Sequence, residues 1–204
     1  MHSPKLQIIR KSSFAAVPWK NGGGITHEAI RVPAGGDSFR WRVSVAHIEA
    51  SGPFSEFAAH NRKMVLLKGA GIDLHFADGV NKTLRRVGEL VEFDGAMRTR
   101  CELLSGPCVD LNLMVVKSES AVVRVERFIE SIAVRAARNE TTLVFPIDRK
   151  ISLQITAGKT ATLEPWDLAV LSQCAGRISR LESPDSSVST TVFVATLAGE
   201  PADG

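Results

Sequence analysis

The sequence predicts an all-β protein with little helix, built as a sandwich or barrel. Apolar and polar residues alternate with a period of two along much of the chain. At positions 39–46 the large apolar side chains occupy odd positions, whereas Arg40, Arg42, Ser44 and Ala46 share the other face. Such alternation is typical of a half-buried strand. Similar short runs recur with turn-forming residues between many of them, which indicates a β-sandwich or barrel.

The predicted strands follow one another along the whole chain. In order they are residues 6–9, 25–32, 39–46, 64–67, 72–76, 90–93, 101–104, 109–116, 122–125, 143–145, 151–155 and 192–197. Turn signals such as Asp94-Gly95 separate many of them. Residues 124–139 are rich in Ala, Arg, Glu and Ile and fit either a short helix or a β connection.

A weak internal echo suggests that the chain contains two related halves. In residues 82–91 and again in residues 159–170, a Lys-Thr pair precedes an acidic residue and an apolar strand. A duplication of this kind predicts two stacked barrel halves within one compact protein. We place the N-terminal half at residues 1–125 and the C-terminal half at residues 126–204.

Length, charge and cysteine content exclude several classes of protein. The 204 residues carry 25 Lys+Arg against 22 Asp+Glu, a net charge of +3 that does not predict nucleic-acid binding. No stretch approaches the roughly 20 apolar residues of a membrane helix, and the N-terminus lacks a secretory signal. Three cysteines without a CxxC motif disfavour a disulfide scaffold or a zinc module. We therefore expect a cytoplasmic protein with no nucleic-acid and no membrane partner.

The most unusual segment is the glycine-rich stretch at residues 18–26. Its three consecutive glycines, 22–24, allow backbone conformations and close approaches that other residues resist. Neither phosphate-loop pattern is present, and residues 25–30 alternate like a strand rather than opening a helix. The segment therefore fits a tight structural turn with Trp19 packed below it, or a turn that forms the wall of a small-ligand pocket.

Catalytic and metal-binding signatures are absent from the sequence. There is no GxSxG elbow, no cysteine nucleophile motif and no HxH or HExxH pair. A first-row metal usually needs three or four converging ligands. His47, His60 and His75 lie on or beside predicted strands, and a barrel could bring them together at one metal site. We predict no catalytic residue, no metal ligand and no cofactor.

Two arginines are the more informative polar residues. Arg42 lies on the polar face of the strand with the clearest alternation, and Arg62 precedes the apolar run 64–67. Inside the mouth of a barrel, a guanidinium can hold a carboxylate with two parallel hydrogen bonds. The alternative is an ordinary arginine that is exposed or paired in a salt bridge.

Several segments resemble the signature motifs of the HutD/Ves family. They are Pro-Trp-Lys-Asn-Gly-Gly-Gly-Ile-Thr at 18–26, Trp-Arg-Val-Ser-Val-Ala at 41–46, Ser-Gly-Pro-Phe-Ser-Glu-Phe at 51–57, Arg62, Leu-Leu-Lys-Gly-Ala-Gly at 66–71, Cys-Glu-Leu-Leu-Ser-Gly-Pro at 101–107 and Asp-Leu-Asn-Leu-Met at 110–114. The motifs lie in the family's order within residues 14–117. The resemblance implies a cupin-like double-stranded β-helix with two cupin halves, a bicupin, that lacks the usual cupin metal ligands. It also implies a role in restraining bacterial histidine utilisation by binding a small acidic intermediate.

The same resemblance places the family's pocket arginine at Arg62. The family's Phe-Pro-Gly-x-Asp-Arg is Phe-Ala-Ala-His-Asn-Arg at 57–62 here, which loses the Pro-Gly turn and the acidic neighbour. The residues that we expect to bind the ligand are Arg62, Lys20, Asn21, Arg42, Ser44 and Asn112. The expected partner is a small anionic metabolite: urocanate, formiminoglutamate or formylglutamate. A homodimer is a possible assembly of the chain.

Two other functions compete with ligand binding without catalysis. Cupin barrels also house metal-dependent enzymes that act on small metabolites, with His47, His60 or His75 as ligands. Alternatively, the barrel presents a surface to a partner protein, and an exposed apolar edge strand or a tight homodimer would favour that function.

Overall fold

The computed structural model describes residues 5–19, 22–35, 38–156, 158–181 and 188–199. Apart from one short 3-10 turn, the regular elements in this part of the chain are all strands, which confirms the predicted all-β class. Residues 124–139 take the β alternative, because they contribute to β12 (Ala121–Phe128) and β13 (Ser131–Arg135). None of the described residues forms a helix of the length and hydrophobicity that a membrane span requires.

The chain folds into two compact units. The N-terminal unit is Phe14–Glu119, and the C-terminal unit comprises the described parts of Met1–Ser13 and Ser120–Asp203. The division therefore differs from the boundary at 125/126 that the sequence suggested. Two strand pairings explain the difference, and both belong to the C-terminal unit.

The first pairing is that of β12, which begins at Ala121 and pairs along its whole length with β19 (Thr190–Ala198). The second is that of β1 (Lys5–Ile9), which pairs antiparallel with β17 (Leu168–Ser172). Hydrogen bonding across a ladder joins strands that lie far apart in the chain. Strand β1 consequently belongs to the same unit as β19, although the two lie far apart in the sequence.

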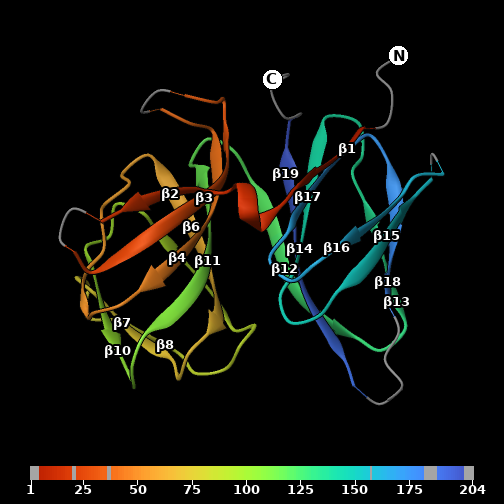
Figure 1. Cartoon of the computed structure of the whole chain (residues 1–204). Coiled ribbons are helices and arrows are strands. Elements are labelled where there is room, and N and C mark those ends of the chain that lie inside the picture. The colour runs from red at the N-terminus through yellow and green to blue at the C-terminus, as the bar shows by residue number, and fades with distance from the viewer. Residues whose placement is uncertain (1–4, 20–21, 36–37, 157, 182–187, 200–204) are drawn as a thin grey trace. The chain divides into compact units, whose positions relative to one another are not determined.

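Two antiparallel sheets form the N-terminal unit (Figure 1). The larger sheet has the order β2 (Ala15–Pro18), β3 (Gly24–Val32), β4 (Trp41–Ile48), β11 (Cys108–Val116), β6 (His60–Lys68) and β9 (Leu90–Asp94). The smaller sheet has the order β5 (Gly52–Pro53), β10 (Thr99–Leu103), β7 (Ile72–Phe76) and β8 (Asn81–Leu84). Met64 and Leu66 of the larger sheet pack in one apolar cluster with Ile72 and Leu74 of the smaller one.

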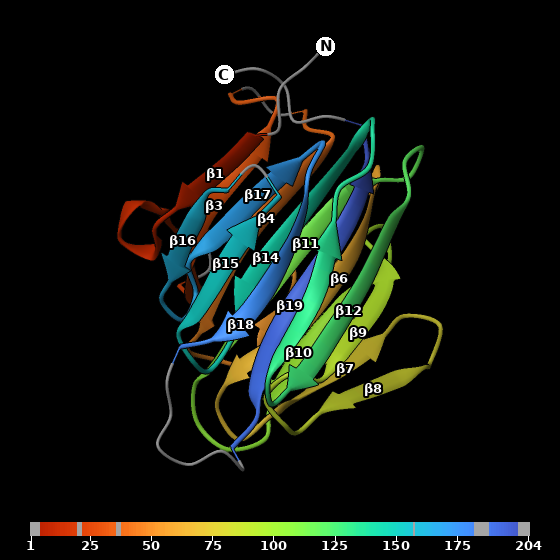
Figure 2. The ribbon, with the colours of Figure 1, turned by 90° about the vertical axis from the view of Figure 1, so that its right-hand side faces the viewer.

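The C-terminal unit also consists of two antiparallel sheets (Figure 2). One has the order β1, β17, β14 (Glu140–Pro146), β19 and β12. The other has the order β13, β18 (Ala175–Arg180), β15 (Ile151–Ile155) and β16 (Thr160–Leu163).

The two units repeat the same eight-strand pattern. In chain order, β4 to β11 of the first unit correspond to β12 to β19 of the second. The sheet β4-β11-β6-β9 matches β12-β19-β14-β17, and the sheet β5-β10-β7-β8 matches β13-β18-β15-β16. The two segments of the sequence echo fall at equivalent places, β8 to β9 and β16 to β17. The strand order thus shows the duplication that the sequence only suggested.

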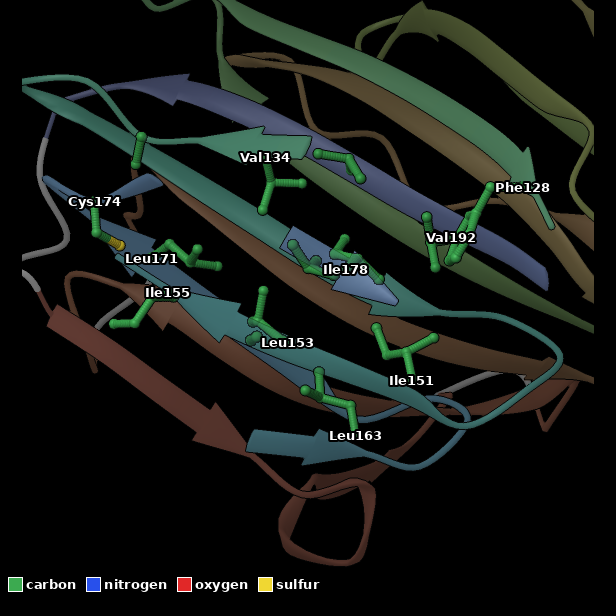
Figure 3. Close-up of a cluster of buried hydrophobic side chains, with 14 residues drawn as sticks. Phe128, Val134, Ile151, Leu153, Ile155, Leu163, Leu171, Cys174, Ile178 and Val192 are labelled. Atoms are coloured by element: carbon green, nitrogen blue, oxygen red, sulfur yellow. The ribbon is translucent and has the colours of Figure 1, made fainter. Parts of the chain in front are cut away.

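Apolar side chains fill the interior of the C-terminal unit. In Figure 3, Leu153 and Ile178 from one sheet and Leu171 and Val192 from the other extend into a common cluster of 14 buried residues, all of them hydrophobic. Burial of each such side chain stabilises the fold by roughly 1.5–3 kcal/mol. The corresponding interior of the N-terminal unit is different, because several of its inward positions carry polar residues.

Strand β4 shows this difference most clearly. The sequence predicted a half-buried strand in which Arg42, Ser44 and Ala46 share the polar face. In the structure both faces are covered: Val43 is fully buried, and Ser44 and Ala46 expose only 2% and 6% of their surface. The polar face of β4 is therefore an inner wall and not an outer surface.

Candidate ligand-binding cavity

A cavity of about 530 Å³ opens in the N-terminal unit. Its floor is the inner face of β3, β4, β11 and β6, and its rim includes β2 and the segment from Pro53 to Phe57. Pockets for small metabolites usually have volumes of about 300–1,000 Å³, so this cavity is large enough for one.

Antiparallel pairing arranges the polar side chains of the floor in rows. Met114 of β11 lies opposite Arg42 of β4 on one side and opposite Arg62 of β6 on the other. Two positions further along, Asn112 lies opposite Ser44 of β4. Because successive residues of a strand alternate between faces, these positions all point to the same side of the sheet. Segments separated by about 20 to 70 residues in sequence thus form one polar surface.

Arg62 occupies the deep part of this surface. It exposes only 6% of its area, and its guanidinium carbon lies 5.1, 5.9 and 5.0 Å from the ring centroids of Phe54, Phe57 and Phe93. One Nη donates a long hydrogen bond of 3.4 Å to the Ser55 carbonyl, and Nε has no hydrogen-bond partner among the described residues. Burial lowers the pKa of Arg62 to about 10, so the group remains a cation at neutral pH.

A buried cation of this kind is unfavourable unless an anion compensates it. Aromatic ring faces supply part of the compensation through cation–π attraction. Among the ion pairs of the described residues, none involves Arg62. The side chain therefore presents to the cavity a desolvated positive charge that makes no ion pair within the described residues.

Asp110 and Asn112 lie on β11 beside this arginine. They expose 1% and 5% of their surface, and one side-chain oxygen of each has no hydrogen-bond partner within the described chain. Burial raises the pKa of Asp110 to about 7, although the charge of Arg62 and a hydrogen bond from the Asn112 side chain act to lower it. The floor thus combines an unpaired cation with two unpaired oxygen atoms.

A second polar group lies on β3 and β4. Arg31 makes a bidentate ion pair with Glu28, with its Nε 3.1 Å from one carboxylate oxygen and its Nη 2.9 Å from the other. An Nη of Arg42 lies 3.8 Å from the same carboxylate, and its guanidinium carbon is 5.0 Å from the Phe57 ring centroid. Burial lowers the pKa of Arg42, and Glu28 opposes that shift. This second group carries two positive charges and one negative charge.

The glycine-rich segment shapes the rim. The Trp19 backbone N–H donates to the carbonyl of Gly24 at 2.9 Å, and the Trp19 indole N–H donates to Thr26 Oγ1 at 2.8 Å. The Trp19 ring meets Phe54 edge-on at 6.0 Å. A Cβ at Gly24 would overlap the carbonyl oxygen of His47, so only glycine allows this approach. The turn places Trp19 in the cavity wall, which is the second of the two alternatives drawn from the sequence.

Four of the six predicted ligand-binding residues meet in this cavity: Arg62, Arg42, Ser44 and Asn112. Lys20 and Asn21 lie outside the described residues. That the four bind a ligand stays a prediction.

Other residues of the cavity were not predicted from the sequence. Among them are Asp110, Glu28, Arg31, Phe54 and Phe57. A signal was present for Asp110, which alternates with Asn112 on one strand. Glu28 and Arg31 gave no comparable signal, because a β-bulge between Glu28 and Ile30 shifts the register and brings the two side chains to the same face.

The three histidines considered as metal ligands do not form a common site. His60 is buried, and its Nε2 lies 2.8 Å from the carbonyl oxygen of Phe39, which can only accept a hydrogen bond. Nδ1 of His75 lies 3.1 Å from the side-chain oxygen of Asn81, and His47 packs edge-on against His27 at 5.0 Å. Within the described residues, no three His, Cys, Asp or Glu side chains come close enough to hold a metal ion.

Comparison with known proteins connects the chain to one family. A family model described as HutD matches residues 11–188. A protein of the hutC 3′ region of Pseudomonas putida is 40% identical over 111 residues, or 54% of this chain and 58% of that protein. The protein Ves of Escherichia fergusonii is 33% identical over 97 residues, or 47% of this chain and 50% of that protein. The chain thus spans about half the length of these relatives.

Solved structures show the same fold over nearly the whole chain. A conserved protein of unknown function from Pseudomonas aeruginosa has a TM-score of 0.85 and 27% identity, with 96% of this chain and 100% of that chain covered. HutD from Pseudomonas fluorescens has a TM-score of 0.77 and 23% identity, with the same shares covered. A cupin 2 conserved barrel protein from Leptotrichia buccalis has a TM-score of 0.58 and 11% identity, with 93% and 99% covered. The predicted cupin-like fold with two halves is confirmed.

Proposed function

The chain belongs to the HutD family, as its sequence motifs indicated, and we propose that its N-terminal unit binds a small carboxylate of histidine utilisation without transforming it. The observation that carries the proposal is the charge of Arg62, buried in the wall of a cavity with no carboxylate partner among the described residues. A ligand carboxylate would supply the missing anion and accept the hydrogen bond that Nε has free. Charge-assisted hydrogen bonds of this kind contribute about 1.5–3 kcal/mol.

Two observations connect the proposed ligand to histidine utilisation. The Pseudomonas putida relative is named for its position near hutC, and the family motifs resemble proteins associated with histidine degradation. Candidate ligands are urocanate, formiminoglutamate and formylglutamate. All three carry at least one carboxylate, and all are small enough for a cavity of about 530 Å³.

The walls favour urocanate among these three. Trp19, Phe54 and Phe57 line the cavity with aromatic rings, and a planar conjugated body can stack on the face of such a ring. A second carboxylate, as in the two glutamate derivatives, would lie near Arg42, whose charge is partly offset by Glu28 at 3.8 Å. We therefore expect the order urocanate, then the two glutamate derivatives, in decreasing affinity.

Isothermal titration calorimetry with the three acids tests the proposal. We expect at least one acid to bind the wild-type protein, and Arg62→Gln to weaken that binding about 10- to 150-fold. Arg62→Lys, which keeps the charge but loses the planar fork, should retain part of the affinity. Arg100→Gln is the matched control, because Arg100 is an exposed arginine on β10 of the same unit, outside the cavity.

Two results would contradict the proposal. One is a folded wild-type protein that binds none of the three acids. The other is an Arg62→Gln variant that binds as tightly as the wild type. Stoichiometric iron, manganese or zinc in protein purified without a His tag would support the metal-dependent cupin enzyme instead.

A further inference from the structure

Asp110 has an environment that does not suit a permanent negative charge. Its nearest partners across the ladders are apolar: Ala46 on β4 and Leu66 on β6. The side chain exposes 1% of its surface and lines the cavity, and its Oδ1 has no hydrogen-bond partner in the described structure. Neither a salt bridge nor solvent therefore stabilises the ionised form.

The charged and titratable groups around Asp110 come from several strands. Arg62 on β6 is the charge that acts on it most strongly, and the Asn112 side chain donates to it from β11 itself. The thiol of Cys101 on β10 stays neutral, because burial and the nearby Asp110 charge raise its pKa to about 12. The remaining groups that share the cavity or the strand are Cys108, Arg42, Arg31 and Glu28.

A ligand carboxylate at Arg62 would change this balance. It would bring a second negative charge into the same buried space and would satisfy the cation that now favours ionised Asp110. Two carboxylates that share a buried site do not both stay ionised. Once protonated, Asp110 becomes a hydrogen-bond donor, and its O–H can bond a ligand carboxylate oxygen in a short, charge-assisted contact.

We propose that Asp110 is a specificity-determining residue that takes up one proton from solvent when a carboxylate binds at Arg62. The inference rests on the proposed function and adds a rule of recognition to it. The cavity selects monoanionic carboxyl groups that can share a proton with Asp110, and binding weakens when that proton becomes scarce.

The expected pH dependence follows from the free protein. Burial already places the pKa of Asp110 at about 7, and the bound ligand raises it further. At about pH 6 Asp110 is already protonated in the free protein, so ligand binding takes up only a small fraction of a proton. At about pH 8 uptake approaches one proton, and the dissociation constant is about tenfold higher than at pH 6.

Calorimetry with urocanate in two buffers of different ionisation enthalpy measures the proton uptake directly. We expect about one proton at pH 8 and close to none at pH 6. The imidazole of urocanate titrates near the range of histidine and adds its own pH dependence to binding. The ratio of the dissociation constants of variant and wild type at one pH cancels this contribution, and that ratio is the second measurement. Asp110→Asn, a neutral side chain of the same shape, should bind about as well as wild type at pH 6 and about tenfold tighter at pH 8.

The matched control is Asp73→Asn, the same change on β7 outside the cavity, which should leave the ratio near one at both pH values. Formylglutamate replaces urocanate if only that acid binds, since its carboxyls are ionised throughout this range. Binding without proton uptake in the wild-type protein, or an Asp110→Asn ratio that does not change with pH, overturns this inference and leaves the proposed function standing. Absence of binding by every acid overturns both.

Discussion

The guanidinium carbon of Arg42 lies 5.0 Å from the centroid of the Phe57 ring. The guanidinium carbon of Arg62 lies 5.9 Å from the same centroid. A ring face attracts a cation by about 0.5–2 kcal/mol, depending on how dry the site is. One aromatic side chain thus helps to hold two like charges in the same cavity, where they would otherwise repel each other.

Replacing Phe57 by Leu should therefore weaken ligand binding. Leucine retains an apolar side chain but has no ring quadrupole, so both arginines lose a contact that orients them. We expect urocanate affinity to fall about 2- to 30-fold, measured by calorimetry. Phe145→Leu, the same change at a fully buried position of the C-terminal unit, should lower stability and leave affinity unchanged. Equal affinity in the Phe57→Leu variant and the wild type would contradict the role given to this ring.

Glu28→Gln should have the opposite effect. The carboxylate of Glu28 pairs with Arg31 and lies 3.8 Å from Arg42, so its loss removes one negative charge from that end of the cavity. Removal of one negative charge near a bound anion is expected to strengthen binding by about 1 kcal/mol, or about fivefold. Glu102→Gln, on the smaller sheet beside His75, is the control. Weaker binding in Glu28→Gln would show that the ion pair positions the ligand rather than opposing it.

Two alanine substitutions separate the roles of the glycines at the rim. A Cβ at Gly24 would overlap the His47 carbonyl oxygen and contact Trp19, so Gly24→Ala should destabilise the protein by about 1–3 kcal/mol or more. Gly22 has a φ of +70° but no atom within 4 Å of the position of a Cβ. Gly22→Ala should therefore cost only the strain of that backbone conformation, about 1 kcal/mol. Urea unfolding of both variants checks the order, and an equal loss would count against the close approach at Gly24.

Asp110 should make the stability of the free protein depend on pH. Its pKa is about 7 in the folded protein, above the ordinary value of 3.8 that applies when the chain is unfolded. Between these values the folded state binds more protons than the unfolded state, so this contribution to stability is lost as the pH rises from about 4 to above 7. At alkaline pH the free energy of unfolding of Asp110→Asn should therefore exceed that of the wild type by about 4 kcal/mol.

Fluorescence in a Trp166→Phe background measures this effect, because Trp19 and Trp41 then report on the N-terminal unit. Urea unfolding at about pH 5 and pH 8 should show the wild type losing stability relative to Asp110→Asn as the pH rises. A constant difference between the two proteins would mean that Asp110 titrates in its ordinary range.

Much of the fold could be predicted because strand alternation is a local property. The pattern around Arg42 and Ser44 identified β4, and similar patterns identified most of the long strands of both units. Residues 124–139 gave an ambiguous signal, since short apolar runs fit both helix and strand periods. Their β conformation depends on pairing with β19 and β18, whose paired residues lie 40 or more positions away in sequence.

The candidate site was predicted only in part, and for a related reason. Family motifs and the chemistry of arginine led to Arg62, Arg42, Ser44 and Asn112. Alternation with Asn112 was the one signal for Asp110, and nothing in the sequence showed that Glu28 lies beside these residues. The ladder between β11 and β6 brings Asn112 and Met114 next to Met64 and Arg62. A pairing between such distant segments leaves no mark in the local order of residues.

The sequence by itself determined that this chain is all-β, that its strands alternate in polarity and that it belongs to the HutD family, since each of these properties is written in short runs of adjacent residues. Only the tertiary structure decided that the polar face of β4 lines a cavity instead of meeting water. The C-terminal unit has the same strand order but fills its interior with residues such as Val192 and Leu171. The physical reason is that alternation only separates the two faces of a strand. The packing of one sheet on another decides which face is enclosed, and therefore which charged side chains are buried next to one another.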